Sequence, residues 1–224
     1  MGKTYVTIGN FSIDNVVSAK GYVELRKIGG NAIHSALGAR YWSQDIGIAT
    51  TIPINYPKSW LDQLAAGGVD LRGVEQVPPA LELEDWFFYR PDGSRIDRLH
   101  ARYKDYAYLA EKKKPLLKSQ VEQMITKMAN NQTPGISLTD FRAQNPISIE
   151  VIPDVYFPLR ACHIAPNDFD VQLSLAKCLK QRGVFVSVDP AAVTMHGSKN
   201  KLSELLSFVD VFLPSEKEVR ALFP

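Results

Sequence analysis

The sequence has little of what several protein classes require. Its 224 residues contain two cysteines, Cys162 and Cys178, and neither belongs to a C-x-x-C pair or to a His/Cys cluster with zinc-finger spacing. We therefore expect neither a disulfide framework nor a structural zinc site, and a reducing compartment is favoured. No apolar run approaches the ~18 residues of a membrane-spanning helix, so we expect no membrane segment.

The sequence also lacks a large excess of charge of one sign. The formal net charge is +2, which is too mild to indicate a nucleic-acid-binding protein. The lysine run at 112–114 is interpreted as a solvated surface segment. The N-terminus, "MGKTYVTIGN", leads directly into a strand pattern and lacks the layout of a signal peptide. We expect a cytoplasmic protein that binds neither nucleic acid nor membranes.

What the sequence does contain is a regular alternation of strand and helix patterns. β-branched and apolar runs bounded by Gly, Pro or Asp predict strands, and amphipathic runs with cap residues predict helices. The expected strands are 4–10, 21–28, 46–52, 161–166, 184–190 and 209–214. The expected helices are 31–42, 57–66, 118–130, 170–182 with Gly183 past its end, 201–208 and 215–223. A hairpin with its turn at 91–93 is expected over 81–100.

This alternation predicts an α/β fold with a doubly wound, mainly parallel sheet flanked by helices. We expect one domain over 1–224, with the hairpin forming a small β layer beside the sheet. Ligands of such sheets bind at the carboxyl ends of the strands. The segments expected there are 9–14, 29–30, 166–167, 189–190 and 214–215.

The pair Gly29–Gly30 stands between a predicted strand and a predicted helix, where backbone often approaches a ligand. It does not belong to a phosphate loop, because the sequence has no G-x-x-x-x-G-K-[ST] string. It does not complete the dinucleotide fingerprint G-x-G-x-x-G either, because Asn31 occupies the third position. Both common nucleotide-binding interpretations fail on spacing.

The helix after the glycine pair has two unlike faces. At ~100° per residue, His34 falls within about 60° of Asn31, while the opposite side is apolar apart from Arg40. One interpretation is a solvated polar face beside a simple turn. The other is a face that lines a ligand pocket, since Asn and His are short hydrogen-bonding groups rather than the Lys and Glu usual on solvated helices.

Several strings in order along the chain carry a family resemblance. They are "TIGNFSIDNVV", "GGNAIHSALGARYWSQDIGIATTI", "LAAGGVDLRGV", the hairpin 81–100, "VSVDP" and "VDVFLPSEKEVRALFP". In this order and spacing the chain resembles the ribokinase-like, or PfkB, family of sugar and nucleoside kinases. The resemblance extends over the whole chain.

The resemblance implies ATP-dependent, Mg²⁺-assisted phosphoryl transfer to a hydroxyl of a small sugar or related compound. The residues that match the family's acceptor-binding positions are Asp14, Gly29, Gly30, Asn31 and His34. A β lid formed by about 11–28 and 81–100 would close over the acceptor. Two subunits could pair through this lid, because its run 86–89 is aromatic.

The resemblance places Asp189, Ser215 and Glu218 on the phosphate and magnesium side, with Glu218 organising Mg²⁺ through water. Each also has a purely structural interpretation. Ser215 and Glu218 have the spacing of a helix capping box, and Asp189 could simply form a turn at a strand end. His163, on a short apolar strand, is interpreted as a core histidine.

The chain departs from the family at three places. His34 stands where an asparagine is usual, and Ser215 replaces the asparagine of an N-x-x-E element. The G-A-G-D segment, which carries the family's anion hole and general base, is absent. We therefore expect no catalytic base in this chain, a domain incomplete at its C-terminal end, and little kinase activity alone. A non-catalytic sugar-binding or regulatory remnant, or an unrelated Rossmann-like binding domain, remain alternatives.

Overall fold

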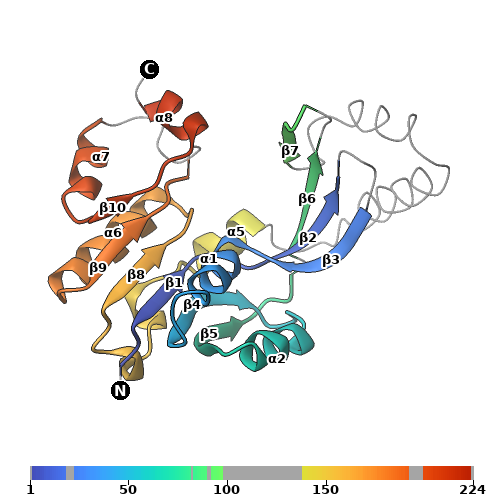
Figure 1. Cartoon of the computed structure of the whole chain (residues 1–224), viewed down its shortest axis with the longest axis horizontal. Helices are drawn as coiled ribbons and strands as arrows, with labels where there is room; N and C mark the ends of the chain where they lie inside the picture. The colour runs from blue at the N-terminus through green and yellow to red at the C-terminus, as the bar shows by residue number, and fades with distance from the viewer. Residues whose placement is uncertain are drawn as a thin grey trace.

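A six-stranded parallel sheet forms the centre of the computed structural model, which describes residues 2–18, 23–81, 83–89, 92–97, 138–191 and 199–222. The strand order is β10-β9-β8-β1-β4-β5 (Figure 1). The strands are β1 Tyr5–Ile8, β4 Ile46–Pro53, β5 Val69–Val77, β8 Ala161–Ile164, β9 Phe185–Val188 and β10 Val211–Phe212. The doubly wound parallel sheet predicted from the sequence is confirmed. The helix expected at 118–130 lies outside the described residues.

The chain winds in two directions from the centre of this sheet. From β1 it passes through α1 and α2 toward β5, and from β8 it passes through α6 and α7 toward β10. Right-handed crossovers place the two helix pairs on opposite faces. The winding direction reverses between β1 and β8, which pair in parallel. The helices are α1 Asn31–Ala39, α2 Lys58–Ala66, α5 Leu138–Gln144, α6 Phe169–Gln181, α7 Lys199–Leu206 and α8 Glu216–Leu222, with short 3₁₀ turns η2 Ile149–Val151 and η3 Asp154–Tyr156.

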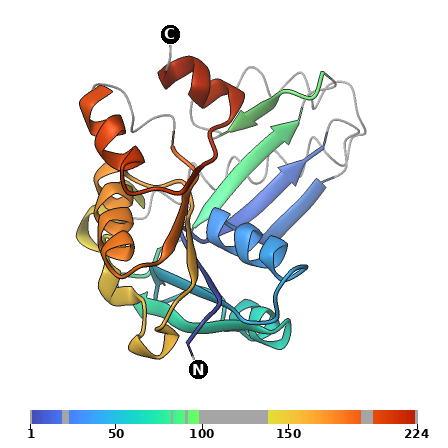
Figure 2. The same ribbon diagram turned by 60° about the vertical axis from the view of Figure 1, so that its left-hand side comes forward.

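A second sheet stands at an angle beside the first (Figure 2). Its order is β3-β2-β6-β7, from β2 Ser12–Val17, β3 Val23–Gly29, β6 Glu84–Tyr89 and β7 Arg95–Asp97. Strands β6 and β7 are antiparallel, so the hairpin predicted over 81–100 is present. Because β2 follows β1 directly, this sheet is attached at the carboxyl edge of the main one. Its action as a lid stays a prediction.

Apolar clusters cover the two faces of the main sheet. One joins β1, β8 and β9 to α6 and contains Ile8, Ile164 and Leu175. The other joins β4 and β5 to α1 and α2 and contains Ile33 and Ile48. Strands buried on both faces read as apolar runs, which is why the central strands were predictable from the sequence. In the part of the chain that the structure describes, no helix has the length and apolar character of a membrane crossing.

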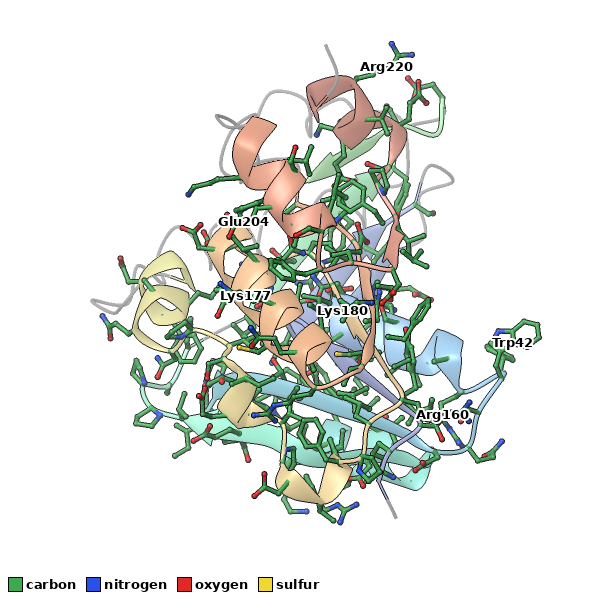
Figure 3. All side chains as sticks on the ribbon, turned by 90° about the vertical axis from the view of Figure 1, so that its left-hand side faces the viewer. Trp42, Arg160, Lys177, Lys180, Glu204 and Arg220 are labelled. Atoms are coloured by element: carbon green, nitrogen blue, oxygen red, sulfur yellow. The ribbon has the colours of Figure 1, made fainter. Side chains whose placement is uncertain are left out.

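Strands β2 and β5 and helix α5 were not among the elements expected from the sequence, and the end of helix α1 differs from the expectation. Strand β5, at the edge of the sheet, was not predicted: four of its nine residues are polar or charged, and only Val69 and Gly73 are buried. Helix α1 ends at Ala39 and not at Trp42, which projects from the turn after it and is 91% exposed (Figure 3). Arg40, on the apolar side of that helix, donates from Nε to the Gly67 carbonyl oxygen at 3.2 Å. The arginine thus links the end of α1 to the turn after α2.

Candidate functional site

The candidate site lies at the carboxyl edge of the main sheet, where the winding reverses between β1 and β8. Ligands of open α/β sheets bind at such switch points. Asn31 bridges the two strand ends: its Oδ1 accepts from the Asn10 backbone N–H at 2.7 Å, and its Nδ2 donates to the Pro166 carbonyl at 2.9 Å. The structure therefore brings the predicted segments 9–14, 29–31 and 166–167 together at one edge.

Asp14, on β2, is held in a defined orientation. Its side chain is nearly buried, and its Oδ1 accepts a 2.6 Å hydrogen bond from the Ser12 hydroxyl. Its Oδ2 lies 3.6 Å from Nε2 of His34, which is 64% exposed. Lys27 on β3 and Asp85 on β6 flank Asp14 in the sheet register. One carboxylate oxygen is thus fixed by the protein, while the other faces an accessible imidazole.

The two glycines have separate structural reasons. A Cβ at Gly29 would lie 2.0 Å from the Asp14 carboxyl carbon, so only glycine leaves room for that carboxylate. Gly30 has φ of 110°, and a Cβ there would meet the backbone of Asn10 at 2.4 Å. The pair therefore packs β2 against the start of α1. The sequence indicated a close approach of the backbone to another group at this pair. In the structure the groups approached are the Asp14 carboxylate and the Asn10 backbone of the same chain.

The electrostatic state of His34 depends on Asp14. The nearby Asp14 carboxylate raises the pKa of His34, and partial burial opposes this to a lesser extent. The protonated imidazole is therefore favoured near a carboxylate that would otherwise face solvent. At this position a protonated histidine offers two N–H donors, and a neutral one offers a donor and an acceptor, so its charge decides which groups of Asp14 or a ligand it can bond.

A second group of acidic and polar residues lies at the ends of β9 and β10. Burial raises the pKa of Asp189 to about 6, and the negative charge of Glu218 adds to the shift. Glu218 also forms the predicted capping box: its Oε2 accepts from the Ser215 N–H and hydroxyl, both at 2.7 Å, and its own N–H donates to Ser215 Oγ at 3.4 Å. The capping interpretation is confirmed. A role toward Mg²⁺ stays a prediction, since capping and metal binding are compatible.

Gln172, on α6, was missed by the sequence analysis. Its fully buried Nε2 donates to the carbonyl oxygens of Ala165 and Asp189, at 3.0 and 2.7 Å. The helical periodicity places Gln172 on the same face as the apolar residues of α6. Its hydrogen-bond partners are carbonyl oxygens at the ends of two strands, and no sequence pattern reveals them.

His163 is a core histidine, as expected. It is 7% exposed, its Nδ1 lies 3.0 Å from the Ser187 hydroxyl, and burial lowers its pKa. Within the described residues no group of three or more His, Cys, Asp or Glu could hold a metal ion. Asp189 and Glu218 are near enough for the charge of one to raise the pKa of the other, and proteins commonly bind Mg²⁺ through one or two carboxylates with the rest of its shell water.

Comparisons with known proteins agree with this architecture, although no family model matches the chain. The cytidine kinase of Thermococcus kodakarensis is 25% identical over 214 residues, which are 95% of this chain and 62% of that protein. A ribokinase structure from Giardia lamblia has a TM-score of 0.64 at 14% identity, covering 98% of this chain and 59% of that one.

A nucleoside kinase from Burkholderia thailandensis, solved in complex with inosine, has a TM-score of 0.62 at 14% identity and covers 97% of this chain and 62% of its own. The chain thus spans less than two thirds of the length of these relatives. The resemblance found in the sequence is supported by a similarity that runs over nearly all of the chain. The chain has the fold of the ribokinase-like kinases.

Proposed function

We propose that this chain forms the acceptor side of a ribokinase-like kinase, which transfers the terminal phosphoryl group of ATP to a hydroxyl of a nucleoside or small sugar. The observation that carries the proposal is the Asp14–His34 pair at the switch point, with one carboxylate oxygen fixed by Ser12 and the other facing the imidazole. The relatives named cytidine kinase and nucleoside kinase favour a nucleoside over a free sugar as acceptor.

The chain's own residues would contribute binding and orientation. An ionised carboxylate accepts strong hydrogen bonds from hydroxyl groups, and Asp14 Oδ2 is available to a ligand that displaces His34. The imidazole then offers a second polar group to a neighbouring hydroxyl. Two adjacent hydroxyls, as on a ribose ring, would match two adjacent protein groups. Orientation of this kind is a large part of catalysis in phosphoryl transfer.

ATP and Mg²⁺ belong to the proposal as its cofactors. Asp189 and Glu218 would hold the metal, with Glu218 acting through water and Ser215 fixing its carboxylate. A bound Mg²⁺ would neutralise charge that develops on the transferred phosphoryl group. It would also counteract burial and the Glu218 charge, which together raise the pKa of Asp189.

A second candidate is a non-catalytic nucleoside- or sugar-binding protein. It is favoured by one observation: the contacts of Asp14 and His34 provide for binding and orientation of a ligand and do not by themselves supply a chemical step. Under this alternative the Asp14–His34 pair binds its ligand in the same way, but no hydroxyl is phosphorylated. For either candidate we expect weak phosphoryl transfer by this chain alone.

The test measures ligand binding and phosphoryl transfer separately. The midpoint of thermal unfolding is recorded with cytidine, inosine or ribose, with and without MgATP, and ADP formation is measured in parallel. We expect cytidine or inosine to stabilise the wild-type chain and not Asp14→Asn. Asp62→Asn, on the exposed side of α2 where Asp62 pairs with Lys58, is the matched control and should respond like the wild type.

Rapid ADP formation would exclude the non-catalytic candidate, whereas negligible ADP formation is expected under both. Binding with negligible ADP formation supports the acceptor-side role in a chain that does not catalyse alone. Binding with rapid ADP formation supports the kinase and contradicts the expected weak activity. The absence of a response to every nucleoside and sugar, or an equal response in Asp14→Asn, would overturn the proposal in both forms.

A further inference from the structure

The side-chain amide of Gln172 stands out among the buried groups of α6. Its neighbours on the same face, Leu175, Ala176 and Leu179, are apolar and almost completely buried. Gln172 is equally inaccessible, yet it carries an amide whose Nε2 bonds two carbonyl oxygens. Its Oε1 is buried and has no hydrogen-bond partner among the described residues.

This arrangement is costly if the role of Gln172 is packing. A buried polar atom without a partner costs about 1–3 kcal/mol, and an apolar side chain of similar shape avoids that cost. The two hydrogen bonds at Nε2 offset that cost, and their value beyond packing lies in the groups that they hold in place. They hold the carbonyls of Ala165 and Asp189, the residues that directly follow β8 and β9.

A second amide continues the connection toward β1. Pro166 follows Ala165, and its carbonyl accepts from Asn31 Nδ2 at 2.9 Å and from Asn10 Nδ2 at 3.3 Å. Asn31 also begins α1, which carries His34 one turn later. A chain of hydrogen bonds and two peptide units thus runs from α1 to the end of β9.

The ends of this connection coincide with the two halves of the candidate site. At one end are Asp14 and His34, and at the other are Asp189 and Glu218. We propose that Gln172 is a positioning residue that fixes Asp189 relative to the Asp14–His34 pair, with Asn31 completing the connection through Pro166. The proposal rests on the proposed function only in assigning an acceptor and a phosphate to the two ends.

Fixed separation matters because the two ligands of a transfer reaction must meet in one geometry. A misplacement of about 1 Å can cost a hundredfold in rate, and binding groups are held best by locked side chains beneath them. Gln172 would act through the backbone of Asp189, without contact to any ligand.

The experiment uses the 224-residue chain and three proteins: wild type, Gln172→Met and Leu175→Ala. Methionine keeps the length of glutamine and removes both donors. Leu175→Ala removes buried volume from the same face of the same helix and leaves the amide in place, so it is the matched control for general destabilisation. Amide hydrogen exchange is measured by NMR at Asp189, whose N–H donates to the Ile164 carbonyl, and at Val186 in the preceding strand β9, whose N–H donates to Asp210 Oδ2.

In Gln172→Met we expect Asp189 to exchange about tenfold faster relative to Val186, because local opening no longer breaks two further hydrogen bonds. In Leu175→Ala the two amides should accelerate by the same factor. If the ratio is unchanged in Gln172→Met, or changes equally in both variants, the positioning role is overturned.

A second measurement follows the amide shifts of Asp189 and Glu218 during titration with Mg²⁺ alone. We expect Gln172→Met to weaken the apparent affinity about threefold to tenfold, and Leu175→Ala to leave it unchanged. Equal affinity in wild type and Gln172→Met overturns the positioning role. If the wild type shows no response to Mg²⁺, the metal side of the proposed function fails, while the exchange ratio still decides the role of Gln172.

Discussion

The two edges of the main sheet both carry aspartates, but their environments are opposite. At the amino edge Asp70 accepts from Arg72, from the Tyr156 hydroxyl at 3.0 Å and from Lys3, whose Nζ lies 3.2 Å away. Burial alone would raise the pKa of Asp70, but these partners, Arg72 foremost, outweigh it and lower the pKa strongly. Lys3 also pairs with Asp45 at 2.7 Å. Charges at this edge are compensated within the protein.

At the carboxyl edge the compensation is incomplete. Asp189 is partly buried and close enough to Glu218 for its pKa to rise. Asp14 has one oxygen bonded by Ser12 and the other 3.6 Å from a largely exposed His34. An aspartate therefore stabilises the fold at the amino edge, where side chains of the protein compensate its charge. At the carboxyl edge, where this compensation is incomplete, an aspartate is available to a ligand. A group whose pKa is shifted, as that of Asp189 is, marks a candidate site when it lies at such an edge.

The largest expected effect comes from closing the space beside Asp14. Gly29→Ala would place a methyl group 2.0 Å from the Asp14 carboxyl carbon, so the carboxylate must move. We expect loss of nucleoside affinity of about a hundredfold, as for loss of a charged hydrogen bond, and destabilisation of about 1–3 kcal/mol from overpacking. Calorimetric titration and urea denaturation measure the two effects.

Gly38→Ala is the matched control for this substitution. Gly38 lies near the end of α1, and a Cβ there meets nothing within 4 Å. It should leave affinity unchanged and stabilise the helix by up to about 1 kcal/mol. If both glycine variants bind equally well, the assignment of Asp14 to the acceptor site is wrong.

At the amino edge we expect the reverse pattern. Tyr156→Phe removes a fully buried hydroxyl that donates to Asp70 and accepts from the Gly73 N–H at 3.2 Å. The free energy of unfolding should fall by about 1–3 kcal/mol, with no change in nucleoside affinity. The exposed Tyr41→Phe should change neither quantity measurably. A Tyr156→Phe chain that keeps its stability but loses affinity would reverse the roles of the two edges.

A smaller effect is expected from Asp189→Asn. Between pH 3.8 and about pH 6 the folded carboxyl holds a proton that the unfolded one has lost, so stability falls as pH rises through this window. Above this window the wild type carries the cost of a partly buried negative charge, and Asp189→Asn removes it. The variant should therefore be more stable than the wild type, by only about 1 kcal/mol because partial exposure screens that cost. Urea denaturation at pH 7 and pH 4 tests this, because the gain should shrink at the lower pH. An Asp189→Asn chain that is less stable at pH 7 contradicts incomplete compensation at this edge.

The smallest effect concerns His34. Asp14 raises the pKa of His34, so the ion pair is present at low pH and lost as pH rises through that pKa. If a ligand hydroxyl competes with His34 for Asp14, nucleoside affinity should rise by roughly threefold over the same range. His34→Gln should flatten this profile, measured by calorimetric titration from pH 5.5 to 8. A pH dependence that persists in His34→Gln would assign it to another group.

Much of the fold was predictable because the central strands are apolar and alternate with capped helices. Gly183 past α6 and the Ser215–Glu218 capping box are local signals, and both are present in the structure. The edge strand β5 was missed because four of its nine residues are polar or charged. The family resemblance identified Asp14 and His34. In the structure Gly29 leaves room for the Asp14 carboxylate, and the sequence indicated this glycine only by its position between a predicted strand and a predicted helix.

The bridging residues could not be predicted in the same way. Nothing in the periodicity of α6 indicates that the Gln172 amide bonds two strand-end carbonyls. For Asn31, the resemblance suggested direct ligand binding, whereas its Oδ1 and Nδ2 both bond the protein. Such interactions depend on where strand ends meet in space, which is decided by the packing of residues far apart in the chain.

That separation also has a consequence for the order of folding. The contact of Asn10 with Pro166 joins residues 156 positions apart, and that of Asn31 with Pro166 joins residues 135 apart. Strands β1, β4 and β5 can pair from the first 77 residues, before the chain reaches β8. Contacts of long range form late, because loop closure must be overcome first. During synthesis the acceptor side would therefore fold as an open half-site and be closed only when residue 166 leaves the ribosome.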